Sequence, residues 1–326
     1  MSPEFNLKSL QGRAEFLSKV RTFFAKRFVL EVDVCALVRC PSLDANIESI
    51  EAFVSDSASG YLHTSPEFAM KRLLSEGISD IYYLGHVFRK NDLGRLHNPE
   101  FTMIEWYRLG MPFGAFIEEA CELIRLFLGP LPMRLLSYRD AFLIYAKADP
   151  FDPNFNGPKA ARAIGISLSS DSVEWGHDDW LHLLMSHAVE PRLGKDELTV
   201  ITDYPPSQAA LSCIAEKNGF PVAERFEIYH KGIELSNGYH ELTDANEQRR
   251  RFILENTARE SAGKKPYPLD EGFLSALQKG LPDCCGVSVG FDRLLLLHFG
   301  LNSIHEVLPF SWEGSLPTRC QNETPH

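Results

Sequence analysis

Hydrophobic side chains recur along this chain with two different spacings, and segments with each spacing alternate. In residues 9–28, Phe16, Val20 and Phe23 recur at three- and four-residue intervals between Arg and Lys, which predicts an amphipathic helix. Residues 29–34 then alternate apolar and polar side chains, which predicts a strand. Helical spacing returns in residues 113–129, 137–149, 178–194, 246–256 and 270–280. The chain thus contains both helices and strands, and its 326 residues can form one large α+β domain or two ordinary ones.

The most polar predicted hairpin spans residues 81–107. Residues 81–89 read as one strand, and after Pro99 a second strand places Glu105 and Tyr107 on one face and Ile104 and Trp106 on the other. The connecting loop of about ten residues is rich in Arg, Asn and His. Fixed arginines beside carboxylates suit a polyphosphate bound next to a cationic amine. An ordinary surface loop explains this segment, taken alone, equally well.

A helix is also predicted directly after two strands that flank the turn at residues 55–60. Ser65 suits the N-cap, Pro66 the first helical position and Gly77 the C-terminal stop. Capping and the helix dipole are enough to explain Ser65 and Glu67. A helix N-terminus at the end of a strand is also a natural place to hold a ligand.

Residues 220–244 form a second segment rich in chemical groups. A strand leads to Gly232, and the Asn237-Gly238 pair predicts a turn with Glu234 and Glu241 on either side. Two carboxylates beside one turn can meet one cation, either Mg²⁺ or a substrate ammonium. Two solvated acidic residues are the simpler alternative.

The last patterned block, residues 282–300, predicts a strand, a glycine-flanked turn at 286–290 and a helix from Asp292. Gly290 permits a close approach of backbone to a ligand. Arg293 lies in the first helical turn, where its charge opposes the helix dipole, and this position indicates an anionic partner.

Composition narrows the class of protein. The chain has 326 residues, 44% of them hydrophobic and 24% charged, as in ordinary water-soluble domains, and no apolar run of about 20 residues that would predict a membrane span. Seven cysteines without a CxxC pair favour a reducing cytoplasm over a disulfide framework or zinc site. The net charge of −11 removes the usual electrostatic footprint of a nucleic-acid binder. The basic run 249–251 is expected on a solvated or dimer-facing helix surface.

Three blocks in order resemble the signature of the class II aminoacyl-tRNA synthetases. They are residues 9–37, the hairpin that opens with Phe88-Arg89, and Gly290-Phe291-Asp292-Arg293. The segments TSPEFAMKRLL, HNPEFTMIEWY and ELSNGYHELTD resemble the lysyl branch. More narrowly, the chain resembles the truncated lysyl-tRNA synthetase paralogues that attach (R)-β-lysine to a lysine of translation elongation factor P.

The resemblance covers residues 9–311 and implies a class II catalytic core, an antiparallel sheet flanked by helices. It implies one catalytic domain over residues 1–326, with a helical insertion at 149–195, and a cytoplasmic homodimer. The first catalytic helix begins within about ten residues of Met1, so we expect no anticodon-binding domain and no tRNA partner.

The resemblance also assigns roles to individual residues. It implies that ATP is held by Arg89, Lys90, Asn91, Asn98, Glu234, Leu235, Gly290 and Arg293. Arg89 and Arg293 would stabilise charge during catalysis. It implies that the lysine substrate is held by Ser65, Pro66, Glu67, Tyr107 and Glu241. Ser288 would form the pocket floor, and Mg²⁺ would be held by Glu234 and Glu241.

The implied reaction is an attack of the lysine carboxylate on the α-phosphorus of ATP, followed by aminolysis of the adenylate, with no enzyme nucleophile. Two departures from the family pattern affect this picture: Cys35 replaces a proline, and Asn91 replaces a glutamate that contacts adenine. Two alternatives therefore stay open: an α-lysine-activating enzyme with another acceptor, and a catalytically silent regulatory paralogue.

Overall fold

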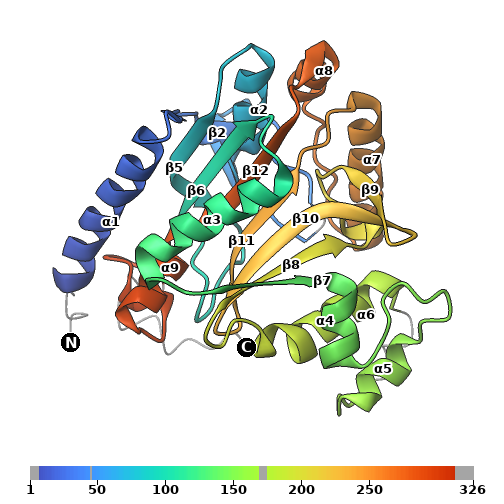
Figure 1. Ribbon diagram of the computed structural model, residues 1–326. Helices are drawn as coiled ribbons and strands as arrows, with labels where there is room; N and C mark the ends of the chain where they lie inside the picture. The colour runs from blue at the N-terminus through green and yellow to red at the C-terminus, as the bar shows by residue number, and fades with distance from the viewer. Residues whose placement is uncertain (1–6, 45, 169–174, 313–326) are drawn as a thin grey trace, which may run out of the picture.

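A large sheet forms the centre of the computed structural model, which describes residues 7–44, 46–168 and 175–312 (Figure 1). Its nine strands run in the order β1-β5-β6-β12-β11-β10-β8-β7, with β9 paired to β10. Two neighbouring pairs, β1 with β5 and β7 with β8, are parallel, and the other pairs are antiparallel. A smaller sheet has the order β2-β4-β3. The expected antiparallel sheet flanked by helices is confirmed.

The strands have the following bounds. The large sheet contains β1 (Leu30–Glu31), β5 (Ile81–Phe88), β6 (Glu100–Leu109), β7 (Met133–Ser137), β8 (Leu198–Tyr204), β9 (Ile214–Lys217), β10 (Phe220–His230), β11 (Ile233–His240) and β12 (Cys284–Gly290). The small sheet contains β2 (Leu37–Val38), β3 (Glu51–Ser55) and β4 (Ala58–Leu62). The predicted strand at 29–34 is therefore only two residues long.

The α-helices are α1 (Leu7–Ala25), α2 (Glu67–Ser75), α3 (Phe113–Leu128), α4 (Tyr138–Ala141), α5 (Gly157–Ala163), α6 (His177–Leu184), α7 (Ala245–Ser261), α8 (Glu271–Gly280) and α9 (Phe291–Phe299). Among the described residues, π-helical turns occur at η1 (Phe142–Ala146) and η3 (Met185–Val189). In the same part of the chain, 3₁₀ turns occur at η4 (Glu190–Arg192), η5 (Pro206–Gln208) and η6 (Ile304–Glu306). Within the described ranges, no helix combines the length and apolar character needed to cross a membrane.

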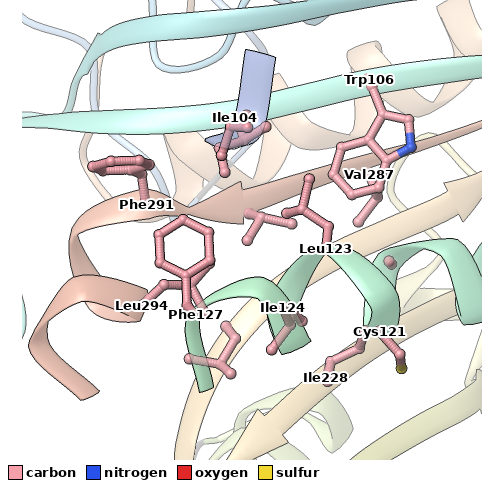
Figure 2. Packing of buried hydrophobic residues seen from close by; sticks show 14 of the residues in the cluster. Ile104, Trp106, Cys121, Leu123, Ile124, Phe127, Ile228, Val287, Phe291 and Leu294 are labelled. Carbon is pink, nitrogen blue, oxygen red and sulfur yellow. The ribbon is translucent and has the colours of Figure 1, made fainter. Parts of the chain in front are cut away.

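Strand β6 separates two hydrophobic cores, as its alternation predicts. Ile104 and Trp106 belong to one core, and Met103 and Tyr107 belong to the other. Figure 2 shows the first core, where Phe127 and its neighbours on α3 pack against the sheet and α9. On the opposite face α2 packs against α8, and the rings of Phe68 and Phe273 stack with centroids 4.3 Å apart. The functional groups on β6 thus lie on the face covered by α2.

Segment 149–195 contributes to a third core over the β7–β8 end of the sheet. Its apolar residues, among them Leu181 and Leu184, pack with Phe142 and Ile201. The basic run on α7 lies elsewhere and is neutralised within the chain. Arg249 pairs with Glu271, and Arg250 and Arg251 pair with Glu247.

Two predicted turns are wrong, and close packing explains both. Asn237-Gly238 lies inside β11, opposite Glu227 and Phe226 of β10. The chain instead turns at Lys231-Gly232, where both residues have positive φ, 51° and 71°. Residues 286–290 likewise belong to β12. Glycine at position 238 allows β11 to pack closely against the Phe226 ring, because a Cβ there would lie only 2.5 Å from that ring.

Gly238→Ala is expected to lower the free energy of unfolding by about 1–3 kcal/mol, as overpacking a filled core usually does. The added methyl would meet the Phe226 ring on one side and Val287 Cβ, at 2.9 Å, on the other. Urea denaturation measures the change. Gly114→Ala is the control, because it lies in α3 with no atom within 4 Å of the new Cβ. Equal stability of the two variants would contradict the prediction.

Candidate active site

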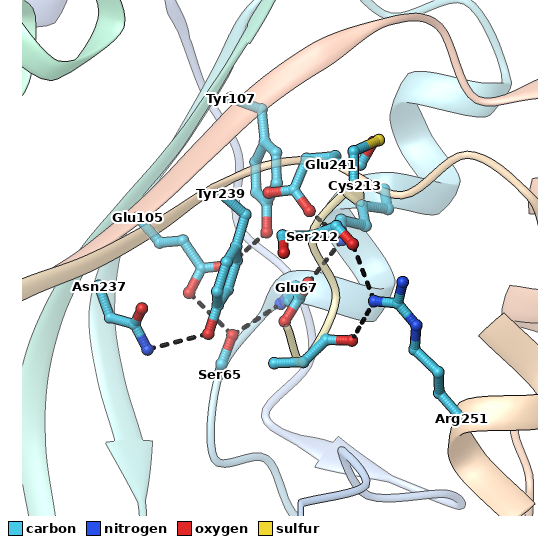
Figure 3. Close-up of polar contacts among 12 residues, drawn as sticks. Ser65, Glu67, Glu105, Tyr107, Ser212, Cys213, Asn237, Tyr239, Glu241 and Arg251 are labelled. Atoms are coloured by element: carbon cyan, nitrogen blue, oxygen red, sulfur yellow. Dashed lines mark hydrogen bonds and ion pairs between the residues drawn. The ribbon is translucent and has the colours of Figure 1, made fainter. Parts of the chain in front are cut away.

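A buried polar cluster lies where the start of α2 meets β6 and the end of β11 (Figure 3). The Ser65 hydroxyl donates to Glu105 Oε2 at 2.8 Å and accepts from the Glu67 amide at 3.0 Å. Helix α2 begins at Glu67 with Pro66 as the capping residue, one residue later than predicted. Ser65 nevertheless satisfies a backbone donor of the first turn, so capping and ligand-site geometry use the same hydroxyl.

Glu105 links this serine to the predicted amine-binding tyrosine. Tyr107 Oη donates to Glu105 Oε1 at 2.9 Å. Burial, together with the charge of Glu67, raises the pKa of Glu105 to about 8, although hydrogen bonds from Ser65 and Tyr107 act in the opposite direction. The sequence-based assignment of site residues omitted Glu105. The alternation of β6 contained the signal, since it places Glu105 on the same face as Tyr107.

Lys71 is a second residue that the sequence reasoning missed. Its side chain is fully buried, and its Nζ lies 2.6 Å from Glu67 Oε1 and 2.5 Å from Glu241 Oε2. Burial opposes the ammonium charge, but the two carboxylates outweigh it and raise the pKa of Lys71. Burial also raises the pKa of Glu241, while Lys71 acts against that rise. The i,i+4 spacing of Glu67 and Lys71 was the available signal.

Strands β11 and β12 form the wall of the cluster. Asn237 Nδ2 donates to the Tyr239 hydroxyl at 2.9 Å, and the backbone oxygen of Asn237 accepts from Ser288 Oγ at 3.3 Å. Ser288 is the sheet neighbour of both Asn237 and Glu105. Gly286 leaves room beside them, because a Cβ there would lie 2.2 Å from Glu241 Oε1. On β12 the wall therefore consists of small residues, Gly286 and Ser288, next to the acidic groups.

A cationic end of the site forms where the hairpin loop meets α9. Arg293 donates to the backbone oxygen of Glu234 and to His97 Nε2, both at 2.8 Å, and lies 3.8 Å from the Glu234 carboxylate. Burial and the neighbouring Arg293 lower the pKa of His97, so its ring is a neutral acceptor. Arg293 is held by backbone and ring, and Glu234 remains partly exposed next to it.

Arg89 directly follows β5 at the base of the hairpin loop, with its guanidinium 5.1 Å from the centre of the Phe101 ring. Its Nε is buried and has no hydrogen-bond partner among the described residues. A buried unpaired donor of a charged group costs free energy, and an anionic ligand would remove that cost. At this end of the site, Arg89 is thus the residue whose unsatisfied donor an anionic ligand would bind.

The other predicted nucleotide positions differ in their surroundings. Asn91 is exposed with φ of 66°, a conformation that asparagine tolerates better than glutamate, which gives its departure from the family pattern a backbone reason. Lys90 Nζ lies 3.8 Å from Glu48. Asn98 is buried and bonded to the backbone of Glu100 and Trp312.

At Leu235 and Gly290, only the backbone would be available to a nucleotide. The Leu235 side chain lies in the hydrophobic core. Gly290 precedes α9, and a Cβ added there would have the Arg293 side chain as its nearest neighbour, at 3.6 Å. Nucleotide contact at all of these positions stays a prediction.

The expectation that Glu234 and Glu241 meet one cation is wrong. The two residues lie seven apart in sequence along the extended β11 segment, which separates their Cα atoms by roughly 20 Å at ~3.3 Å per residue. Glu241 is moreover paired with Lys71. Within the described residues, no group of three or more His, Cys, Asp or Glu side chains could hold a metal ion.

Comparison with known proteins agrees with a site that has an acidic cluster at one end and arginines at the other. A family model described as "tRNA synthetases class II (D, K and N)" matches residues 2–313. A protein of Salmonella typhi named elongation factor P–(R)-beta-lysine ligase is 41% identical over 315 residues, covering 95% of this chain and 96% of that protein. One of the same name from Hamiltonella defensa is 39% identical over 317 residues, covering 95% and 97%. The chain belongs to this class II synthetase family.

The three blocks of the class II synthetase family surround the site. The first supplies α1 and β1 at one edge of the sheet, the second is the β5–β6 hairpin, and the third is β12 followed by α9. Because β6 and β12 are adjacent strands, the second and third blocks place their arginines at one end of the cluster. Cys35, which replaces the proline of the first block, is exposed and reduced.

Proposed function

We propose that this protein activates (R)-β-lysine with ATP as an adenylate and transfers it to a lysine side chain of elongation factor P. One observation carries the proposal. A buried pocket of acidic side chains and a pair of arginines, Arg89 and Arg293, lie along the same set of neighbouring strands. The pocket suits a substrate with two ammonium groups, and the cationic end suits a polyphosphate. The names of the relatives specify the amino acid and the acceptor.

The acidic pocket would orient the substrate. Glu67 and Glu241, both buried, and the Tyr107 hydroxyl are the groups that would accept hydrogen bonds from its two ammonium groups. Ser65 and Pro66 begin the turn that brings Glu67 into place. Fixing both amines leaves the carboxylate to point along the sheet toward Arg89, so attack on phosphorus becomes effectively unimolecular.

The cationic end would stabilise the transferring phosphoryl group. Arg89 and Arg293 present charge that is already oriented, and preorganised charge is the largest contribution in most such reactions. Mg²⁺ commonly binds through one or two carboxylates plus phosphates. Glu234, partly exposed beside Arg293, fits the role of that protein ligand. Mg²⁺ would supply further charge neutralisation on the phosphates.

The second step needs no nucleophile from the enzyme, because the acceptor amine attacks the adenylate and AMP leaves. The nearby cysteines agree with this assignment. Burial raises the pKa of the Cys213 thiol to about 11, so little of it is thiolate at neutral pH. The reactive groups are therefore the two substrates and ATP.

We propose further that the protein is cytoplasmic, since its proposed acceptor works in translation. We also propose that it forms a homodimer. The β1 edge supports the dimer: Phe28 is 91% exposed and Leu30 is 53% exposed next to a strand that pairs with β5 on one side. Light scattering should give twice the chain mass, and Phe28→Glu should give the monomer.

The decisive experiment incubates purified protein with ATP, (R)-β-lysine and elongation factor P. We expect a mass gain of one lysyl group on the acceptor and lysine-dependent pyrophosphate exchange. Faster exchange with α-lysine, together with an unmodified acceptor, would favour the alternative of an α-lysine-activating enzyme. Absence of exchange with either isomer would favour the catalytically silent paralogue.

Affinity for the lysine substrate is expected to increase with pH up to about pH 8. The pKa of Glu105 is about 8 in the empty pocket, and a diammonium substrate favours the ionised carboxylate. Below pH 8, Glu105 must lose its proton when the substrate binds. The value of 1/KM for lysine should therefore fall about tenfold for each unit by which the pH is lowered. Initial rates between pH 6.5 and 8.5 measure this. Glu105→Gln should make the slope shallower, because Glu241, whose pKa burial also raises, still titrates, and an unchanged slope in that variant would refute the assignment.

A further inference from the structure

We propose that Lys71 is a positioning residue of the acidic pocket, an internal counter-cation that holds the carboxylates of Glu67 and Glu241 in place before substrate binds. The inference rests on the proposed function, because it concerns how that pocket is prepared for a diamino acid. Lys71 has no role in the mechanism above. It is nevertheless one of the largest fully buried side chains of the described structure.

The geometry of Lys71 sets it between the two predicted substrate-binding carboxylates. Its Nζ contacts one oxygen of each, at 2.6 Å and 2.5 Å. The second oxygens, Glu67 Oε2 and Glu241 Oε1, are not the atoms used by Lys71. Glu241 Oε1 is the atom that faces Gly286, where a Cβ would lie only 2.2 Å from it. Each carboxylate can thus bind Lys71 and still offer an oxygen to the substrate.

Charge balance gives the contact a function. Glu67, Glu105 and Glu241 are only 8%, 2% and 1% exposed, and like charges crowded in a buried site reduce their repulsion by taking up protons. A protonated carboxyl is a poor acceptor for an ammonium group. Burial raises the pKa of Glu241 and Lys71 acts against that rise, and the contact of Lys71 with both Glu67 and Glu241 offsets one charge of the cluster.

The other groups around Lys71 do not supply this charge. Cys284 on β12 has a thiol whose pKa is raised by burial and by Glu241, so it is neutral. Tyr107 on β6 has a pKa raised well above its usual value and is neutral too. His240, which precedes Glu241, has a raised pKa and also favours the Glu241 anion, but its ring nitrogens pair with Glu224 and Asp283 and not with a pocket carboxylate. Lys71 is therefore the cation in direct contact with the pocket carboxylates within the described chain.

The test compares Lys71→Met with wild type and with Arg72→Met. Arg72 is the next residue on α2 and is exposed, so its variant removes the same charge from the same helix. We expect Lys71→Met to raise KM for (R)-β-lysine at pH 7 by at least about tenfold, the equivalent of one pKa unit. At the same pH, KM for ATP should change less than about twofold, because Lys71 lies in the acidic pocket and not at the cationic end. The pH at which 1/KM for lysine levels off should rise above the wild-type value.

A purely structural role predicts something else. It would lower kcat and thermal stability and leave the pH profile of KM unchanged, and that result would overturn the proposal. Wild-type kinetics at every pH in Lys71→Met would overturn it as well. A wild-type protein without lysine-dependent exchange would instead reject the proposed function, so the two failures are distinguishable.

Chemical rescue provides a second measurement if Lys71→Met folds poorly. Lys71→Ala leaves a cavity between two carboxylates, which methylammonium can fill and neutralise. Restoration of lysine-dependent exchange, or of the melting temperature, by methylammonium but not by methanol supports the proposal. Equal effects of the two compounds would show that filling space is sufficient and would overturn it.

Discussion

Arg89→Met is expected to reduce lysine-dependent pyrophosphate exchange by about 10²–10³-fold, the usual loss when one preorganised charge-stabilising donor is removed. The guanidinium is held over Phe101, and its buried Nε has no partner among the described residues. Its bonding capacity is therefore reserved for a ligand. Methionine can occupy the same place on the ring, so the melting temperature should stay constant or rise slightly.

Arg95→Met is the matched control for this variant. Arg95 lies in the same loop, is exposed, and donates to the backbone oxygen of Asn302. Its loss should change exchange less than about threefold, in keeping with the small value of exposed charges. If both variants lose activity equally, general loop damage would be the cause, and the assignment of Arg89 to the phosphate would fail.

Gly286→Ala is expected to raise KM for (R)-β-lysine by more than about 100-fold, because a misplaced pocket group can cost that much. The new methyl would lie 2.2 Å from Glu241 Oε1 and 2.3 Å from the Tyr107 ring. Both groups would have to move, and both belong to the acidic pocket. Steady-state kinetics with varied lysine at saturating ATP measures the effect.

Gly238→Ala separates damage to the pocket from damage to the core. Gly238 pairs with Val287, the residue after Gly286, and its missing Cβ points at the Phe226 ring in the core. This variant should lose stability and keep KM for lysine. Equal KM values in the Gly286 and Gly238 variants would mean that the methyl at 286 does not disturb the substrate pocket.

The hairpin and the helices were predictable because their signals are local. Alternation in β6 identified both faces of the strand, and helical spacing located α1, α3 and α8 to within a few residues. The turns were less predictable where a glycine is required by packing against a residue that is distant in sequence. Gly238 and Gly286 resemble turn residues in sequence, yet each lies within a strand because another side chain occupies the space of its Cβ.

Individual site residues were assigned by matching them to the family, and their roles stay predictions. Their partners depend on tertiary contacts between α2, β6 and the end of β11, which no local pattern records. Lys71 reads in the sequence as an ordinary helix lysine, and its burial between two carboxylates emerges only when these elements meet. The separation of Glu234 from Glu241 follows from the misassigned turn, since a turn would have brought them together.

The two walls of the acidic pocket differ in how freely they can change during evolution or engineering. On the α2 side, Ser65, Glu67 and Lys71 are tied to Glu105 and Glu241, so one substitution disturbs several charges. On the β12 side, Gly286 has no room for a Cβ, but Ser288 makes one weak contact at 3.3 Å. Enzymes that accept other diamino acids should therefore arise by changes at position 288, with the helix wall retained to bind the amine groups.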